Sequence, residues 1–203
     1  MATNTFAEIC LPEARLLADL TGICYDLERA RDFATRLKSA LAIRSQDSSL
    51  VEPLTIASIV QYCRPFSGGK RVNVNERLLA VFTKNQRDMH DWIRAVRDRH
   101  IAHSINTFEE SRPIARYWLE RVEQEGIASI ECNHHRVIGI GGNDADAIAE
   151  LSTALLNHIG AWMEMEKSSI LSVVRQMPLE KILTGADRRL HSPDLDNPKR
   201  TRS

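Results

Sequence analysis

The sequence has no excess of charge of either sign, because its 203 residues include 27 Lys and Arg and 27 Asp and Glu. A protein without net charge has no long-range field to attract nucleic acid or a membrane surface. Any site for a polyanion must therefore be a local patch of basic side chains. The balance argues against a protein that coats or packages DNA.

Paired cysteines and long apolar runs are also missing. Cys10, Cys24, Cys63 and Cys132 are scattered, with no CxxC pair, which favours a reduced intracellular setting. No apolar run approaches the ~20 residues that span a bilayer. The first residues lack the basic stretch and apolar run of a secretory signal. We therefore expect a cytoplasmic protein with no membrane association.

Motifs for metals and nucleotide phosphates are weak. Cys132, His134 and His135 lie close together, but no second pair of ligands follows at zinc-site spacing, so a solvated hairpin turn is the simpler interpretation. The segment Gly68-Gly69-Lys70 lacks the strand–loop–helix context of a P-loop and is typical of a flexible turn. We predict neither a metal nor another cofactor.

Apolar residues at alternating spacings of three and four predict a long amphipathic helix over residues 13–43, with charged residues on the opposite side. Its apolar stripe comprises Leu16, Leu20, Ile23, Leu27, Ala30, Ala34, Leu37 and Leu41. A shorter helix over residues 53–63 is ended by Pro65. Helical spacing resumes after a possible N-cap at Asn75 and continues to Val96. A last long helix follows a cap resembling Asn143 with Asp146.

A β-hairpin is predicted within residues 113–141. Two short apolar segments, 127–130 and 137–140, flank Asn133-His134-His135-Arg136, which we take as the turn. Residues 114–122 fit a strand and a helix equally well. We expect a mainly α protein: one helical domain over residues 1–184 with this inserted hairpin, and a flexible tail over residues 185–203.

The segment Arg97-Asp98-Arg99-His100-Ile101-Ala102-His103-Ser104 contains two arginines and two histidines at the end of a helical pattern. A guanidinium binds phosphate through paired hydrogen bonds, and an imidazole transfers protons near neutral pH. Metal-free cleavage of a phosphodiester needs both groups. The alternative is a charged helix end with two half-buried structural histidines.

Helical geometry favours the structural alternative in part. On an uninterrupted α-helix, Met89, Ile93, Val96, His100 and His103 fall within a sector of about 80°. Both histidines would then continue the apolar stripe. Arg97 would lie about 120° from His103, so the two meet only if the helix bends or a second chain supplies one of them.

The spacing Arg97-Asp98-x-x-x-x-His103 resembles the signature of HEPN domains. The string RDRHIAHSINTFEE is similar to the version found in bacterial abortive-infection and toxin-like HEPN proteins, and VQYCRPF at residues 60–66 adds to the likeness. The resemblance covers residues 11–110 and the closing helix. It leaves the hairpin and the tail unexplained.

The resemblance implies a helical bundle that forms a homodimer and cleaves RNA without a metal, with the two signatures facing each other across the dimer cleft. His103 would act as the general acid or base, Arg97 would stabilise the phosphate, and Asp98 would orient one of them. Arg99, His100 and Ser104 would support the site. It also implies a toxin or phage-defence effector, with a neutralising antitoxin protein as a further partner.

Two other functions stay open. Relatives without activity suggest a catalytically silent HEPN-like module that binds nucleic acid, a nucleotide or a partner protein. The second is a helical scaffold with structural histidines. Arg64, Lys70 and Arg71 flank the glycine turn and are candidates for a weak RNA-contacting rim. Stacking of bases on tryptophan is a further idea, but the apolar patterns around Trp92 and Trp162 predict core positions instead.

Overall fold

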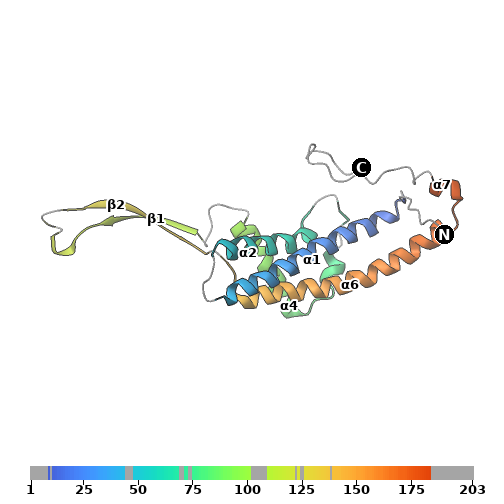
Figure 1. The fold of residues 1–203 in the computed structure, drawn as a ribbon, viewed down its shortest axis with the longest axis horizontal. Coiled ribbons are helices and arrows are strands. Elements are labelled where there is room, and N and C mark those ends of the chain that lie inside the picture. Colours follow the sequence, from blue (N-terminus) through green and yellow to red (C-terminus); the bar gives the residue numbers. More distant parts are fainter. Residues whose placement is uncertain are drawn as a thin grey trace. The chain divides into compact units, whose positions relative to one another are not determined.

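The computed structural model describes residues 9, 11–43, 48–68, 71, 72, 75–101, 109–121, 123, 126–137 and 139–183. Its elements (Figure 1) are α1 Ala14–Ala42, α2 Ser48–Cys63, η1 Arg64–Phe66, α3 Asn75–Leu79, α4 Lys84–Val96, η2 Arg97–Ile101, β1 Glu109–Arg116, η3 Leu119–Arg121, β2 Ser129–Arg136, α6 Gly142–Val174 and α7 Leu179–Leu183. The expectation of a mainly α protein with a small hairpin before the last long helix is confirmed.

The chain divides into two compact units. One comprises Met1–Gly22 with Gly160–Ser203, and the other is Ile23–Ile159. The part of the chain described here contains no helix with both the length and the apolarity needed to cross a membrane.

Most of the predicted stripe of α1 is confirmed, since Leu20, Ile23, Leu27, Ala30, Ala34 and Leu37 are fully buried. Leu16 and Leu41, at its two ends, are only partly buried. The prediction that every charged residue of α1 lies opposite the stripe is wrong. Asp19 and Asp26 are also buried. Burial of a carboxylate requires compensating partners, and those of Asp26 are described below.

α2 begins at Ser48, before the predicted start at Pro53, and it ends at Cys63 as Pro65 predicts. Its faces are used in an unusual way. Thr55 and Ser58 are buried, whereas Leu50 and Ile56 are 50% and 37% exposed. α2 also buries Val51, Ile59, Tyr62 and Cys63, so its buried face mixes apolar and hydroxyl side chains.

The helical pattern after Asn75 is interrupted, which the sequence prediction missed. α3 ends at Leu79, and Thr83 then caps α4. The Thr83 hydroxyl accepts from the Gln86 N–H, while the Gln86 side chain accepts from the Thr83 N–H at 2.9 Å. This capping box satisfies two backbone donors and starts a new helix. The motif Thr-x-x-Gln is the sequence signal from which the start of this helix could have been predicted.

The hairpin is displaced from its predicted position. β1 and β2 pair antiparallel, from Glu109 opposite Arg136 to Arg116 opposite Ser129. The predicted turn at Asn133–Arg136 therefore lies within a strand, and residues 137, 139 and 140 form no strand. The chain reverses after Arg116 instead, through a connection that contains η3 and a left-handed Gly126. Alternation of small apolar and polar residues in β1 was too weak to reveal this strand.

The predicted cap of the last helix is also corrected. α6 begins at Gly142, and the Asp144 carboxylate accepts from the Gly141 N–H at 3.0 Å. Asp146 instead accepts from Lys38 at 2.7 Å and joins α6 to α1. Leu37, Val51 and Ala145 form an apolar cluster beside this pair. In Ile23–Ile159, α1, α2 and α6 thus meet around one core.

The tryptophans differ in burial. Trp162 is buried in α6 as predicted, and its indole N–H donates to Glu166 at 2.9 Å. The core position predicted for Trp92 is wrong, because this side chain is 39% exposed on α4. Trp118, in the hairpin connection, is 57% exposed.

Candidate functional site

Arg97 begins η2, a π-helical turn that follows α4 directly. The α-helical repeat ends at Val96, because the wider π turn changes the angle between successive side chains. The uninterrupted α-helix assumed for the angles above therefore does not hold over Arg97–Ile101, which form a π turn, and His103 lies outside the described residues. Such π turns are frequent at functional sites.

A cavity of about 310 Å³ lies beside Arg97. It is lined by Cys63, Phe66, Ser67, Gly68, Arg94, Arg97 and Asp98. The end of α4 thus supplies Arg94, η2 supplies Arg97 and Asp98, and the η1 turn closes the other side. We refer to these seven residues as the arginine cavity.

One ion pair orders the arginine cavity. The Arg97 guanidinium donates to Asp98 at 2.7 Å, and the two side chains are 41% and 52% exposed. This hydrogen bond raises the pKa of Arg97, so its charge is permanent. The hydrogen bond to Asp98 uses Nη1, one of the nitrogen atoms of a guanidinium group that carries five N–H donors in all. Two arginines and one carboxylate line the cavity, a composition suited to an anion.

Cys63 is not a nucleophile at neutral pH. Burial raises the pKa of its thiol to about 12, against the opposing effect of Arg97 and Arg94. Since only a thiolate attacks efficiently, covalent catalysis by this cysteine is excluded from the candidate chemistry. The Cys63 carbonyl accepts from the Ser67 hydroxyl at 3.0 Å, which shapes the turn beside the cavity.

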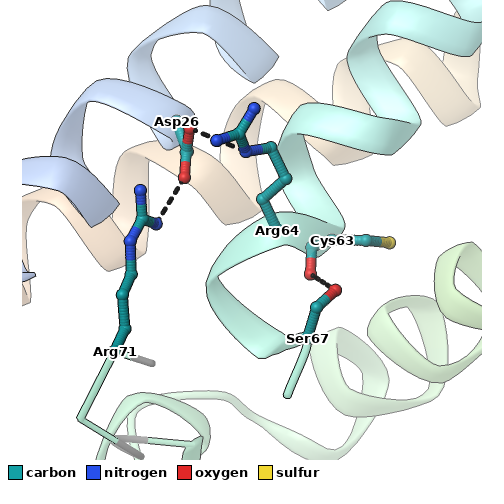
Figure 2. Close-up of polar contacts among 5 residues, drawn as sticks. All are labelled: Asp26, Cys63, Arg64, Ser67 and Arg71. Atoms are coloured by element: carbon teal, nitrogen blue, oxygen red, sulfur yellow. Dashed lines mark hydrogen bonds and ion pairs between the residues drawn. The ribbon is translucent and has the colours of Figure 1, made fainter. Parts of the chain in front are cut away.

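Arg64 and Arg71, the predicted RNA rim, converge on Asp26 (Figure 2). Arg64 Nε lies 3.2 Å from one carboxylate oxygen, and Arg71 Nη1 donates to the other at 2.6 Å. The Asp26 side chain is 3% exposed. Figure 2 shows the Cys63 thiol directed away from this cluster. Arg64 and Arg71 thus compensate a buried charge, a role that the sequence prediction did not foresee.

A buried aromatic group supports α4 behind the arginine cavity. The Tyr62 hydroxyl and His90 Nδ1 lie 2.9 Å apart, and Phe66 packs edge-on against the His90 ring at 4.5 Å between centroids. Burial, with a smaller effect of Arg94, lowers the pKa of His90 to about 4. His90 is therefore neutral at pH 7. The sequence analysis did not single out His90, although this histidine follows Met89 in a segment with the apolar spacing of an amphipathic helix.

The remaining predicted site residues are placed only in part. Arg99 is exposed on η2, and the backbone of His100 belongs to the same turn. The side chain of His100 lies outside the described residues, as do His103, Ser104 and Lys70. The structure therefore brings Arg97 and Asp98 together and adds Arg94 to them, a residue that the signature did not include.

The predicted hairpin turn with Cys132, His134 and His135 is part of β2. His134 Nδ1 lies 2.9 Å from the Ser111 hydroxyl on the facing strand. Within the described ranges, no group of three or more His, Cys, Asp or Glu residues is arranged to hold a metal ion.

Comparison of the chain with protein-family models, with curated proteins and with solved structures finds no match. The arginine cavity and the sequence signature are therefore the features of the chain that point to a function.

Proposed function

We propose that the protein is a metal-independent endoribonuclease of HEPN type, with the arginine cavity as its phosphate site. The observation that carries the proposal is the placement of Arg97, the first residue of the signature, in a cavity with a second arginine. Two guanidinium groups beside an open cavity match the charge of a phosphodiester. The zero net charge of the chain makes such a local site necessary for binding RNA.

The proposed reaction is an internal transfer of the phosphoryl group. The ribose 2′-oxygen attacks phosphorus, its proton passes to the imidazole of one His103, and the P–O5′ bond breaks. His103 of a second copy protonates the departing 5′-oxygen. The products are a 2′,3′-cyclic phosphate and a 5′-hydroxyl, and no oxidant or metal enters the balance.

Arg97 stabilises the negative charge that develops on the phosphoryl oxygens. Asp98 keeps this guanidinium in a defined orientation through the 2.7 Å hydrogen bond. Preorganised donors of this kind are among the largest contributions to catalysis. In a host cell, an enzyme of this type acts as a toxin or phage-defence effector that an antitoxin protein restrains, and the protein works in the cytoplasm.

The test is cleavage of RNA in EDTA by the wild type and by Arg97→Ala, Arg97→Lys and His103→Ala. Loss of a general acid or base lowers the rate by ~10²–10⁴. We expect a comparable loss for Arg97→Ala and incomplete rescue by Arg97→Lys, because an ammonium group lacks the planar pair of donors. Arg36→Ala, which changes an exposed arginine of α1, is the matched control.

RNA binding without cleavage by the folded wild type would assign the protein to the silent HEPN-like modules instead. Unfolding of His103→Ala, followed by circular dichroism, would favour the scaffold function. Cleavage that EDTA abolishes would contradict the metal-free mechanism.

A further inference from the structure

The charged residues that line the arginine cavity are not balanced. Among the described residues they comprise two arginines, Arg94 and Arg97, and one acid, Asp98. The other four lining residues carry no charged group. The wall described here therefore carries one net positive charge, although the whole chain carries none.

The three charges act on the same region of space. Residues three and four positions apart lie on one side of a helix, and this spacing relates Arg94 to Arg97 and Asp98. The Cys63 thiol in the cavity wall responds to all three. Burial is the main reason that its pKa is raised, and beyond burial Arg97 and Arg94 lower this pKa whereas Asp98 raises it. A ligand in the cavity therefore meets two cations and one anion together.

A carboxylate is an unexpected component of a site for an anion. One oxygen of Asp98 accepts from Arg97 Nη1 at 2.7 Å, so this carboxylate is held against the guanidinium that we assign to the phosphate. It repels any anion that binds there, and the repulsion grows with the negative charge of that anion. Asp98 thus affects ligands of different charge to different extents.

The phosphates of RNA differ in charge. A phosphodiester within the chain carries one negative charge, whereas a phosphate monoester at a chain end loses a second proton with a pKa near 6 and carries about two at neutral pH. Given the proposed function, on which this step depends, we infer that Asp98 determines specificity: it matches the arginine cavity to the single charge of an internal phosphodiester and lowers the affinity for terminal phosphates.

The physical reason is the charge that remains after binding. A bound diester neutralises the described wall of the cavity. A terminal phosphate leaves one negative charge beside Asp98 without a matching cation, and a partly desolvated charge without a partner is unfavourable. RNA ends and free mononucleotides are thereby kept from occupying the phosphate site.

Two probes that differ by one methyl group measure this selectivity without any cleavage. Thymidine 3′-phosphate is a dianion at pH 7.5, its methyl ester is a monoanionic diester, and neither has a 2′-hydroxyl. NMR titration of the full chain gives a dissociation constant for each probe. We expect the wild type to bind the diester at least as tightly as the monoester, and Arg97→Ala to bind both at least about tenfold more weakly.

Two variants should shift the selectivity in opposite directions. The energy of a pair of charges scales with their product, so a change in the wall affects the dianion twice as strongly as the monoanion. Asp98→Asn should tighten the diester about threefold and the monoester about ninefold, as for pairs of exposed charges. Arg94→Gln should weaken the same two probes by about threefold and ninefold. The NMR spectrum of each variant shows that it is folded.

Asp88→Asn is the matched control, because it removes a carboxylate from an exposed pair with Lys84 on α4. The eight steps from Asp88 to Val96 alone span about 12 Å of helix, more than the Debye length of about 10 Å at 0.1 M salt. This variant should therefore bind both probes as the wild type does.

The inference is overturned if the wild type binds the monoester more tightly than the diester. It is also overturned if Asp98→Asn changes both affinities by the same factor, because Asp98 would then only orient Arg97. A wild type that binds neither probe into the tens of millimolar has no phosphate site in this cavity. Cleavage of RNA in EDTA, measured separately, decides whether the ribonuclease proposal stands in each of these cases.

Discussion

The buried carboxylate of Asp26 in α1 accepts a 2.6 Å hydrogen bond from Arg71, a residue 45 positions later in the chain. Arg64 occupies the second oxygen of the same carboxylate. This arrangement ties the turn after α2 to the middle of α1, and that turn forms one wall of the arginine cavity. A cluster without proposed catalytic groups therefore anchors the chain next to one wall of the cavity.

Removal of Arg71 is expected to destabilise the fold. Arg71→Ala leaves one oxygen of a buried carboxylate without its partner, and we expect the free energy of unfolding to fall by about 1–3 kcal/mol. In the Asp26→Asn background, Arg71→Ala should lower the free energy of unfolding by less, because residue 26 then carries no negative charge. Urea titration of the four proteins measures this coupling. Lys84→Ala, which breaks an exposed pair with Asp88, is the control and should leave the urea midpoint nearly unchanged. Equal costs in both backgrounds would show that Arg71 and Asp26 do not interact.

The stability of the protein should fall in mild acid because of His90. Burial lowers the pKa of the folded-state imidazole to about 4, from 6.5. Between these values the unfolded chain binds more protons than the folded one, so stability is full above pH 6.5 and declines as the pH falls toward 4. The loss reaches at most about 3 kcal/mol.

Thermal unfolding of the wild type and His90→Phe across this pH range checks that expectation. The phenylalanine variant should show a flatter pH dependence, and His134→Asn, an exposed histidine, should follow the wild type. If His90→Phe loses stability in acid as steeply as the wild type does, the acid sensitivity comes from other titrating groups.

Gly139→Ala should destabilise the junction between β2 and α6. A Cβ atom there would lie 2.6 Å from Val51 Cγ1 and 3.2 Å from Thr55 Oγ1, both on α2. Val51 is buried in the core cluster and has little room to move, so we expect a loss of about 1–3 kcal/mol. Gly160→Ala, in open space within α6, should instead stabilise the protein by up to about 1 kcal/mol. Chemical denaturation of the two variants gives the comparison, and equal effects of the same sign would contradict the packing argument.

The cysteines should differ in reactivity. Cys63 is buried and its pKa is raised to about 12, whereas Cys132 is exposed on β2. Iodoacetamide at pH 8 should therefore alkylate Cys132 at least about tenfold faster than Cys63, because the buried Cys63 thiol is less accessible and stays protonated. Peptide mass spectrometry after timed quenching measures both rates. In urea the difference should disappear, and a fast reaction of Cys63 in the native protein would contradict its assignment as a neutral, inert thiol.

The sequence by itself determined the features that depend on near neighbours. Spacings of three and four residues revealed the stripe of α1, and Pro65 predicted the end of α2, because helix periodicity and the missing proline N–H act locally. The basic signature that begins at Arg97 could likewise be recognised directly in the sequence.

The tertiary structure alone decided which of these residues lie close together. Asp26 with Arg64 and Arg71, the register of β1 on β2, and Arg94 beside Arg97 all join residues through folding or through a helical turn of irregular pitch. Their energies depend on burial and on partners distant along the chain, and periodicity does not encode either quantity. For this reason α1, the end of α2 and the last long helix were predicted well, while the break between α3 and α4, the hairpin register and the role of Arg64 and Arg71 were not.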